Sequence, residues 1–152
     1  MVRRLLKPAC IVLNARGILV VDDDEDLALM VADLLRMEGY QVWTARDGLQ
    51  GSSTYYQHQA QTVLTDIDMP QLDGFEMMRC IRAVNPCARV IYMSGAPERY
   101  RRTLIAEAQN FGASILRKPF KNIALLTLVS SSPVASAMHR LNNHTNVRLS
   151  AM

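Results

Sequence analysis

An α/β fold built on a parallel sheet is predicted by the way apolar segments alternate along this chain. Short runs rich in β-branched residues, typical of strands buried on both faces, are followed by stretches with apolar residues at three- and four-residue steps, typical of helices. The first such pair is residues 18–21 followed by residues 27–37. Strands that alternate with helices pair in parallel through right-handed crossovers, so helices should cover both faces of the sheet.

Five strand–helix units are predicted in order. The expected strands lie at residues 18–21, 40–45, 63–66, 90–93 and 114–116. The expected helices lie at residues 27–37, 47–58, 75–84, 97–110 and 121–130. Gly39 and Gly112 are placed to stop helices, and Pro97 suits a first helical turn. We expect an ordered domain over residues 17–130, an N-terminal leader over 1–16 and a flexible tail over 131–152 with no output domain.

Composition indicates one globular domain. Of 152 residues, 49% are hydrophobic and 20% are charged, which excludes a disordered or fibrous chain. The net charge of +3 is too small to indicate nucleic acid binding. Lys7 and Pro8 interrupt the basic start, and no long uncharged apolar run follows, so neither export nor a membrane span is expected. Cys10, Cys80 and Cys87 show no disulfide or metal spacing, which favours a reducing cytoplasm.

Polar side chains follow the predicted strands at their carboxyl ends, where parallel sheets gather functional groups. Asp22 and Asp23 follow the first strand, Asp66 the third, Ser94 the fourth and Lys118 the fifth. Clustered carboxylates are hard oxygen ligands that suit Mg²⁺, and a hydroxyl and an amine beside them suit a phosphoryl group. Asp66 is the natural acceptor, because a carboxylate can attack phosphorus to give an acyl phosphate.

Four segments, taken in order, resemble the response regulator receiver domains of two-component systems, of which the chemotaxis receiver is a simple example. They are Ile-Leu-Val-Val-Asp-Asp-Asp-Glu-Asp at 18–26, Leu-Thr-Asp-Ile-Asp-Met-Pro-Gln-Leu-Asp-Gly at 64–74, Ile-Tyr-Met-Ser-Gly at 91–95 and Leu-Arg-Lys-Pro-Phe at 116–120. The resemblance covers residues 17–130. It implies a flavodoxin-like, doubly wound (βα)5 fold with strand order 2-1-3-4-5 and helices on both faces.

The resemblance also implies roles for the strand-end residues. A site for Mg²⁺ or Mn²⁺ would take its ligands from the carboxylates of Asp22, Asp23 and Asp66 and from the backbone carbonyl of Asp68. Asp66 would be the phosphorylated aspartate. Ser94 and Lys118 would contact the phosphoryl oxygens, with Ser94 moving toward them on phosphorylation.

The sequence departs from the family pattern in two places. Receivers commonly carry an aromatic ring three residues before the Lys-Pro pair, and this chain has Ile115 there. We therefore assign the switch to Ser94 and Ile115 by position, although isoleucine cannot swing a ring. The spacing between Ser94 and Lys118 is slightly long for the family, and the extra length falls around residues 96–102.

We expect a stand-alone response regulator that accepts a phosphoryl group on Asp66 from a sensor histidine kinase or a histidine phosphotransfer protein. Such a phosphoprotein works in the cytoplasm, within a phosphorelay, and signals by protein contact rather than as a classical enzyme. The chain after Ser130 is too short for a DNA-binding module, so direct nucleic acid and membrane contacts are not expected. A homodimer is expected through the face of the fourth helix, the fifth strand and the fifth helix.

Two other functions stay open. Asp66 and Asp68 match the aspartate pair of haloacid-dehalogenase-type phosphohydrolases, but that family places its nucleophile after the first strand. Ile115 is compatible with a pseudo-receiver, a phosphate-independent interaction module, although the retained strand-end residues argue against it. Asp24 and Asp26 are interpreted as helix-capping residues rather than ligands.

Overall fold

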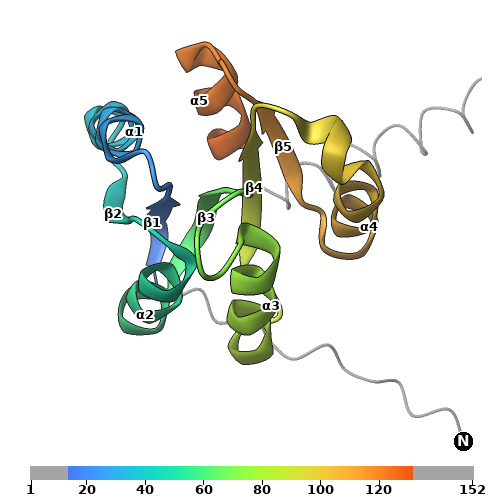
Figure 1. Cartoon of the computed structure of the whole chain (residues 1–152). Helices are drawn as coiled ribbons and strands as arrows, with labels where there is room; N and C mark the ends of the chain where they lie inside the picture. The colour runs from blue at the N-terminus through green and yellow to red at the C-terminus, as the bar shows by residue number, and fades with distance from the viewer. Residues whose placement is uncertain (1–13, 132–152) are drawn as a thin grey trace, which may run out of the picture. The chain divides into compact units, whose positions relative to one another are not determined.

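The computed structural model describes residues 14–131, in which strands and helices alternate as predicted (Figure 1). One sheet contains the strands β1 (Asn14–Val21), β2 (Gln41–Ala45), β3 (Ala60–Asp66), β4 (Arg89–Ser94) and β5 (Ser114–Arg117). The strand order is β2-β1-β3-β4-β5, and all neighbouring strands are parallel. The doubly wound α/β fold with strand order 2-1-3-4-5 is therefore confirmed.

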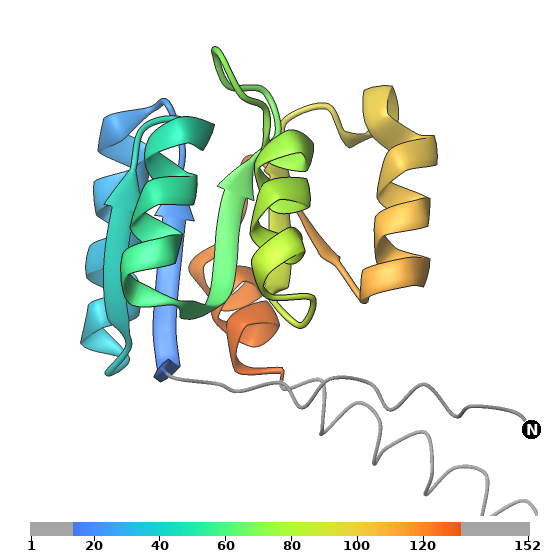
Figure 2. The same cartoon turned by 90° about the horizontal axis from the view of Figure 1, so that it is seen from below.

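The helices follow the strands in turn. They are α1 (Glu25–Met37), α2 (Gly48–His58), α3 (Gly74–Val84), the 3-10 helix η1 (Pro97–Tyr100), α4 (Arg101–Phe111) and α5 (Asn122–Ser130). The chain divides into two compact units after Lys118, and α5 belongs to the second unit. Within the first unit, α1 covers one face of the sheet, and α2, α3 and α4 cover the other (Figures 1 and 2). None of the helices in residues 14–131 has the length and apolar character needed to cross a bilayer.

The central strand β1 is buried on both faces. Ile18, Leu19, Val20 and Val21 each expose 1% of their surface or less. An uninterrupted apolar run is expected for a parallel strand covered on both sides, which explains why the hydropathy pattern identified this strand. Burying one such side chain contributes about 1.5–3 kcal/mol, so β1 provides a rigid base for the residues that follow it.

Strand register brings the predicted functional residues to one edge of the sheet. Val21 pairs with Thr65, so the next residue of each strand, Asp22 and Asp66, emerges at the same level. Asp66 in turn pairs with Met93, one residue before Ser94. In Figure 2 the blue strand β1 and the green strand β3 point toward this common edge. The register alone therefore places these groups together.

Side-chain caps fix where the helices begin. The Asp24 carboxylate accepts a hydrogen bond from the Leu27 N–H at 3.1 Å, which confirms Asp24 as a capping residue of α1. Asp26 lies in the acidic first turn of the same helix, where negative charge is favourable. At α3, Asp73 and Glu76 form a reciprocal capping box. This box fixes the end of the loop that leaves the carboxyl end of β3.

The structure differs from the prediction at three boundaries. β1 begins at Asn14, within the range expected for the leader, because Asn14 pairs with Ala60 through backbone groups that leave no hydropathy signal. β3 likewise begins at Ala60 rather than at residue 63. The single helix expected over 97–110 is η1 followed by α4, since the Arg99 N–H bonds the Ala96 carbonyl in a tighter turn. The rest of the predicted leader and nearly all of the predicted tail lie outside the described residues.

Candidate functional site

Three carboxylates converge at the carboxyl ends of β1 and β3. Asp22, Asp23 and Asp66 each offer an oxygen, and the three oxygens lie within 4.8 Å of one another. Asp22 is buried, Asp66 is partly buried and Asp23 is exposed. The structure thus brings together the three carboxylates that the sequence predicted as metal ligands. Hard oxygen donors of this kind, open to solvent on one side, fit Mg²⁺.

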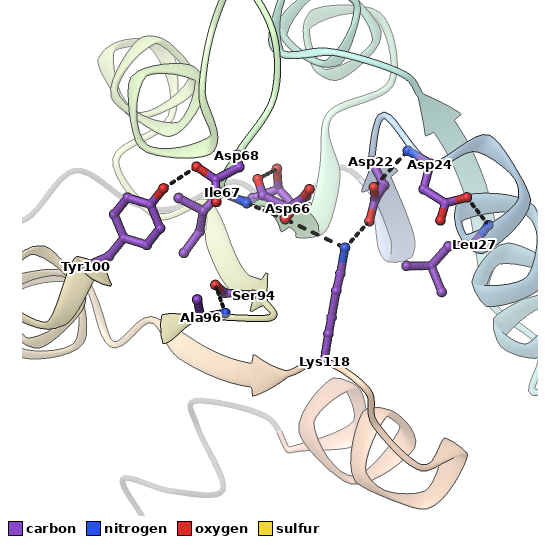
Figure 3. A network of polar contacts seen from close by, with 11 residues as sticks. Asp22, Asp24, Leu27, Asp66, Ile67, Asp68, Ser94, Ala96, Tyr100 and Lys118 are labelled. Atoms are coloured by element: carbon purple, nitrogen blue, oxygen red, sulfur yellow. Dashed lines mark hydrogen bonds and ion pairs between the residues drawn. The ribbon is translucent and has the colours of Figure 1, made fainter. Parts of the chain in front are cut away.

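Lys118 reaches into this cluster from the end of β5 (Figure 3). Its Nζ donates to Asp22 Oδ2 at 2.7 Å and lies 3.6 Å from Asp66 Oδ1. The other oxygen of Asp22 accepts a hydrogen bond from the Asp24 N–H at 2.9 Å. Both oxygens of the buried Asp22 carboxylate are therefore satisfied, which makes its burial tolerable.

The cluster carries more negative charge than its single ammonium group balances. Burial raises the pKa of Asp66 to about 6, against the attraction of Lys118, and repulsion from Asp22 and Asp23 adds to the rise. Burial alone would lower the pKa of Lys118, but its hydrogen bond and attraction to Asp22, and then to Asp66, leave that pKa raised. A divalent cation would relieve this excess charge, which is a second reason why the residues fit Mg²⁺.

The backbone around Asp66 is held by close packing. The Gly74 N–H donates to the Ile67 carbonyl at 3.0 Å, and a Cβ at Gly74 would lie 2.4 Å from the Asp66 carbonyl oxygen. The Thr65 hydroxyl donates to that same oxygen at 2.8 Å, and the Ile67 N–H donates to Asp66 Oδ1 at 2.9 Å. Glycine at residue 74 therefore lets α3 begin directly against the end of β3.

Ser94 lies at the same edge, at the end of β4, and is buried. Its Oγ accepts a hydrogen bond from the Ala96 N–H at 3.1 Å, and its carbonyl accepts one from the Lys118 N–H at 2.8 Å. The serine and the lysine are thus linked through the backbone. Ile115, the other predicted switch residue, lies on β5 with 41% of its surface exposed. The switch roles of Ser94 and Ile115 stay predictions.

Asp68 lies at the rim of the site, on the loop after β3, and its side chain is exposed. Its carboxylate accepts a hydrogen bond from the hydroxyl of Tyr100, the last residue of η1 (Figure 3). This bond is the main reason why the pKa of Tyr100 is raised. The sequence shows that the spacing between Ser94 and Lys118 is long around residues 96–102, but it does not predict the contact of Tyr100 with Asp68. The two residues are 32 positions apart, and such a contact leaves no periodic signal. That the Asp68 carbonyl binds a metal stays a prediction.

The chain belongs to the response regulator receiver domain family, which it matches over residues 18–130. The chemotaxis protein CheY of Bacillus subtilis is 29% identical over 120 residues, which cover 78% of this chain and 98% of CheY. The sporulation initiation phosphotransferase F of the same organism is 31% identical over 104 residues, 68% of this chain and 82% of that protein. This chain is therefore a receiver domain of the two-component type.

Solved structures agree with this assignment. Chemotaxis protein CheY4 of Vibrio cholerae superposes with a TM-score of 0.64 and 27% identity, over 74% of this chain and 94% of that one. The receiver domain of the sensor histidine kinase PA1611 of Pseudomonas aeruginosa gives a TM-score of 0.66 and 28% identity, over 75% of this chain and 93% of that one. That receiver domain has a magnesium ion coordinated in its active site cleft.

Proposed function

We propose that this protein is a response regulator that accepts a phosphoryl group on Asp66 in a Mg²⁺-dependent reaction. The observation that carries the proposal is the meeting of Asp22, Asp23 and Asp66 within 4.8 Å, with the Lys118 ammonium 3.6 Å from Asp66. Three acids and one amine, from three different strands, form the arrangement that a carboxylate nucleophile and an incoming phosphoryl group require.

Each residue of this site has a separate role in the transfer of the phosphoryl group. An Asp66 carboxylate oxygen forms the new bond to phosphorus, while the bond from phosphorus to the donor nitrogen breaks and its electron pair stays on the donor imidazole. Lys118 offsets negative charge on the phosphoryl oxygens, and the Ser94 hydroxyl donates to one of them. The carboxylates of Asp22, Asp23 and Asp66, with the Asp68 carbonyl, would hold Mg²⁺ or Mn²⁺. When bound, that cation supplies the positive charge that lets an anionic donor approach Asp66.

The phosphoryl donor that we propose is a phosphohistidine of a sensor histidine kinase or a histidine phosphotransfer protein. The similarity to CheY and to a sporulation phosphotransferase supports a role in a phosphorelay. We place that role in the cytoplasm, without classical turnover of a substrate. We propose that output passes by protein contact, including homodimer formation, through α4, β5 and α5. The exposed Ile105 on α4 and Ile115 on β5 supply apolar surface for such contacts.

Phosphorylation at Asp66 can be tested directly by intact-protein mass spectrometry after incubation with acetyl phosphate and Mg²⁺. The wild type should gain one phosphoryl group, and Asp66→Asn should gain none. Asp33→Asn is the matched control, because Asp33 lies on exposed α1 surface beside Arg36. A wild type that stays unlabelled would overturn the proposal in favour of an interaction module. Continuous release of phosphate at high turnover would favour a phosphohydrolase instead.

A further inference from the structure

Helix α4 packs against the rest of the domain through a small apolar surface. Only Leu104 is buried among its 11 residues, whereas α3, which is equally long, buries five. Its polar attachment is the Glu107 carboxylate, which accepts two hydrogen bonds from Arg82 of α3. The Arg82 Nε is buried and has no hydrogen-bond partner within residues 14–131, so this guanidinium depends on Glu107. The position of α4 therefore depends strongly on what binds Glu107.

Tyr92 of β4 binds that carboxylate from inside the sheet. Its side chain is fully buried, and its hydroxyl donates to Glu107 Oε2 at 2.7 Å. Tyr92 pairs in register with Ile115 of β5, the position at which receivers commonly carry an aromatic ring. Residues in register direct their side chains to the same face of a pleated sheet. The chain thus has a ring beside the usual position, on the neighbouring strand, and this ring is bonded to α4.

The same strand ends in the serine expected to contact the phosphoryl group. Ser94 follows Tyr92 by two residues, so the two side chains lie on the same face of β4. In the present structure the Ser94 hydroxyl accepts a hydrogen bond from the Ala96 N–H at 3.1 Å. A movement of Ser94 toward a phosphoryl group on Asp66 would shift the end of β4. Lengthening the bond between Tyr92 and Glu107 by about 1 Å would break it.

We infer that Tyr92 is a positioning residue that holds α4 in its unphosphorylated position through Glu107, in place of a rotating ring at residue 115. The inference rests on the proposed phosphorylation of Asp66. A phosphoryl group that moves Ser94 breaks the bond from Tyr92 and loosens α4. Because linkage is reciprocal, removing this bond beforehand must favour the phosphorylated form by the same factor. One hydrogen bond corresponds to a factor of roughly 3 to 10.

Tyr92→Phe tests the inference, because it removes the hydroxyl and keeps the ring against Phe75, 4.9 Å away. Beryllofluoride with Mg²⁺ serves as a stand-in for the phosphoryl group. In the wild type, its binding should accelerate amide hydrogen exchange over residues 101–111. In Tyr92→Phe, these amides should exchange roughly 3- to 10-fold faster without it, and calorimetry should show beryllofluoride binding tighter by a similar factor.

Tyr55→Phe is the matched control. Tyr55 is a buried tyrosine on α2 whose hydroxyl accepts a hydrogen bond from the Asn85 side chain at 2.8 Å, away from α4. This variant should leave both the exchange of α4 and the affinity for beryllofluoride as in the wild type.

Tighter binding is the result that a merely structural role of Tyr92 would not produce. Exchange of α4 that is equal in the wild type and Tyr92→Phe would overturn the inference. Faster exchange with unchanged or weaker beryllofluoride binding would also overturn it, as would wild-type exchange that does not respond to beryllofluoride binding. Failure of the proposed function is distinguishable, because the wild type would then neither bind beryllofluoride nor gain a phosphoryl group from acetyl phosphate, and that result overturns both.

Discussion

The surroundings of the Asp66 side chain disfavour its ionised form. Its pKa in the folded protein is about 6, against 3.8 for an ordinary aspartate, chiefly because of burial. The folded state therefore holds this proton more tightly than the unfolded chain does. Its contribution to stability is fully present below about pH 4 and is lost as the pH rises through about 6, so ionised Asp66 destabilises the metal-free fold at neutral pH.

Asp66→Asn should consequently be more stable than the wild type at neutral pH without metal. We expect the free energy of unfolding to rise on the order of 1 kcal/mol, because burial raises the pKa of Asp66 and so disfavours its ionised form, while solvent at this partly exposed site screens much of the effect. The gain should shrink as the pH falls through 6 and vanish near 4. Urea unfolding in chelator across this range measures it. A gain that is constant with pH would show that ionisation of Asp66 is not its cause.

The turn from β3 into α3 depends on a glycine at its closest approach. A methyl group at residue 74 would lie 2.4 Å from the Asp66 carbonyl oxygen, so Gly74→Ala must displace either the strand end or the helix. We expect a loss of about 2 kcal/mol in stability and slower labelling of Asp66, measured by urea unfolding and mass spectrometry. Gly95→Ala, with nothing within 4 Å of the added methyl group, should leave stability within about 0.5 kcal/mol.

A buried ion pair joins α3 to α4. Arg82 binds Glu107 through two hydrogen bonds of 2.7 and 3.1 Å, and Tyr92 of β4 donates to the same carboxylate at 2.7 Å. Only 9% of the Arg82 side chain and 13% of the Glu107 side chain are exposed. The Arg82 guanidinium also lies 3.7 Å from the centre of the Phe111 ring. Helix α4 is thereby fixed to the sheet by charge as well as by apolar contact.

Removing one partner of this buried pair should lower the free energy of unfolding far more than removing one partner of an exposed ion pair. Glu107→Ala leaves the Arg82 charge buried without its counterion, so we expect a loss of about 3–5 kcal/mol in the free energy of unfolding. Asp33→Ala, which breaks the exposed pair with Arg36 on α1, should change it by less than about 1 kcal/mol. Thermal and urea unfolding of the two variants and the wild type measure these changes in the free energy of unfolding. Similar losses for the two variants would contradict the importance assigned to burial.

The strands, most helices and the strand-end residues could be predicted because each leaves a local signal. A fully buried strand such as β1 is an apolar run, and Asp22 or Asp66 directly follows one. The contacts that sequence missed join distant residues through polar side chains: Arg82 lies 25 residues from Glu107, and Asp68 lies 32 from Tyr100. From the sequence pattern alone, each of these residues is predicted to be a solvent-exposed polar residue of its helix or loop. Only the packed fold reveals its partner.

At the scale of the whole molecule, the site exists only when the sheet is assembled. A cation that binds the assembled carboxylates, and not the unfolded chain, stabilises the fold in proportion to the logarithm of its concentration. Mg²⁺ at about ten times its dissociation constant should add roughly 1.4 kcal/mol to the free energy of unfolding of the wild type. A chelator should remove that gain in a thermal melt.

Asp23→Asn should lose most of the stabilisation by Mg²⁺ without a large change in metal-free stability, since Asp23 is exposed. Asp26→Asn is the control, because Asp26 is also exposed on α1 but lies outside the carboxylate cluster. Equal stabilisation of all three proteins by Mg²⁺ would place the cation elsewhere.

The bond between Lys118 and Asp22 spans 96 residues of chain. During synthesis, Asp22 leaves the ribosome long before its partner amine does. Until β5 joins the sheet, the nascent protein has its acids but not the ammonium that complements them. A chain that ends before Lys118 would therefore leave the buried Asp22 carboxylate without the ammonium group that balances it.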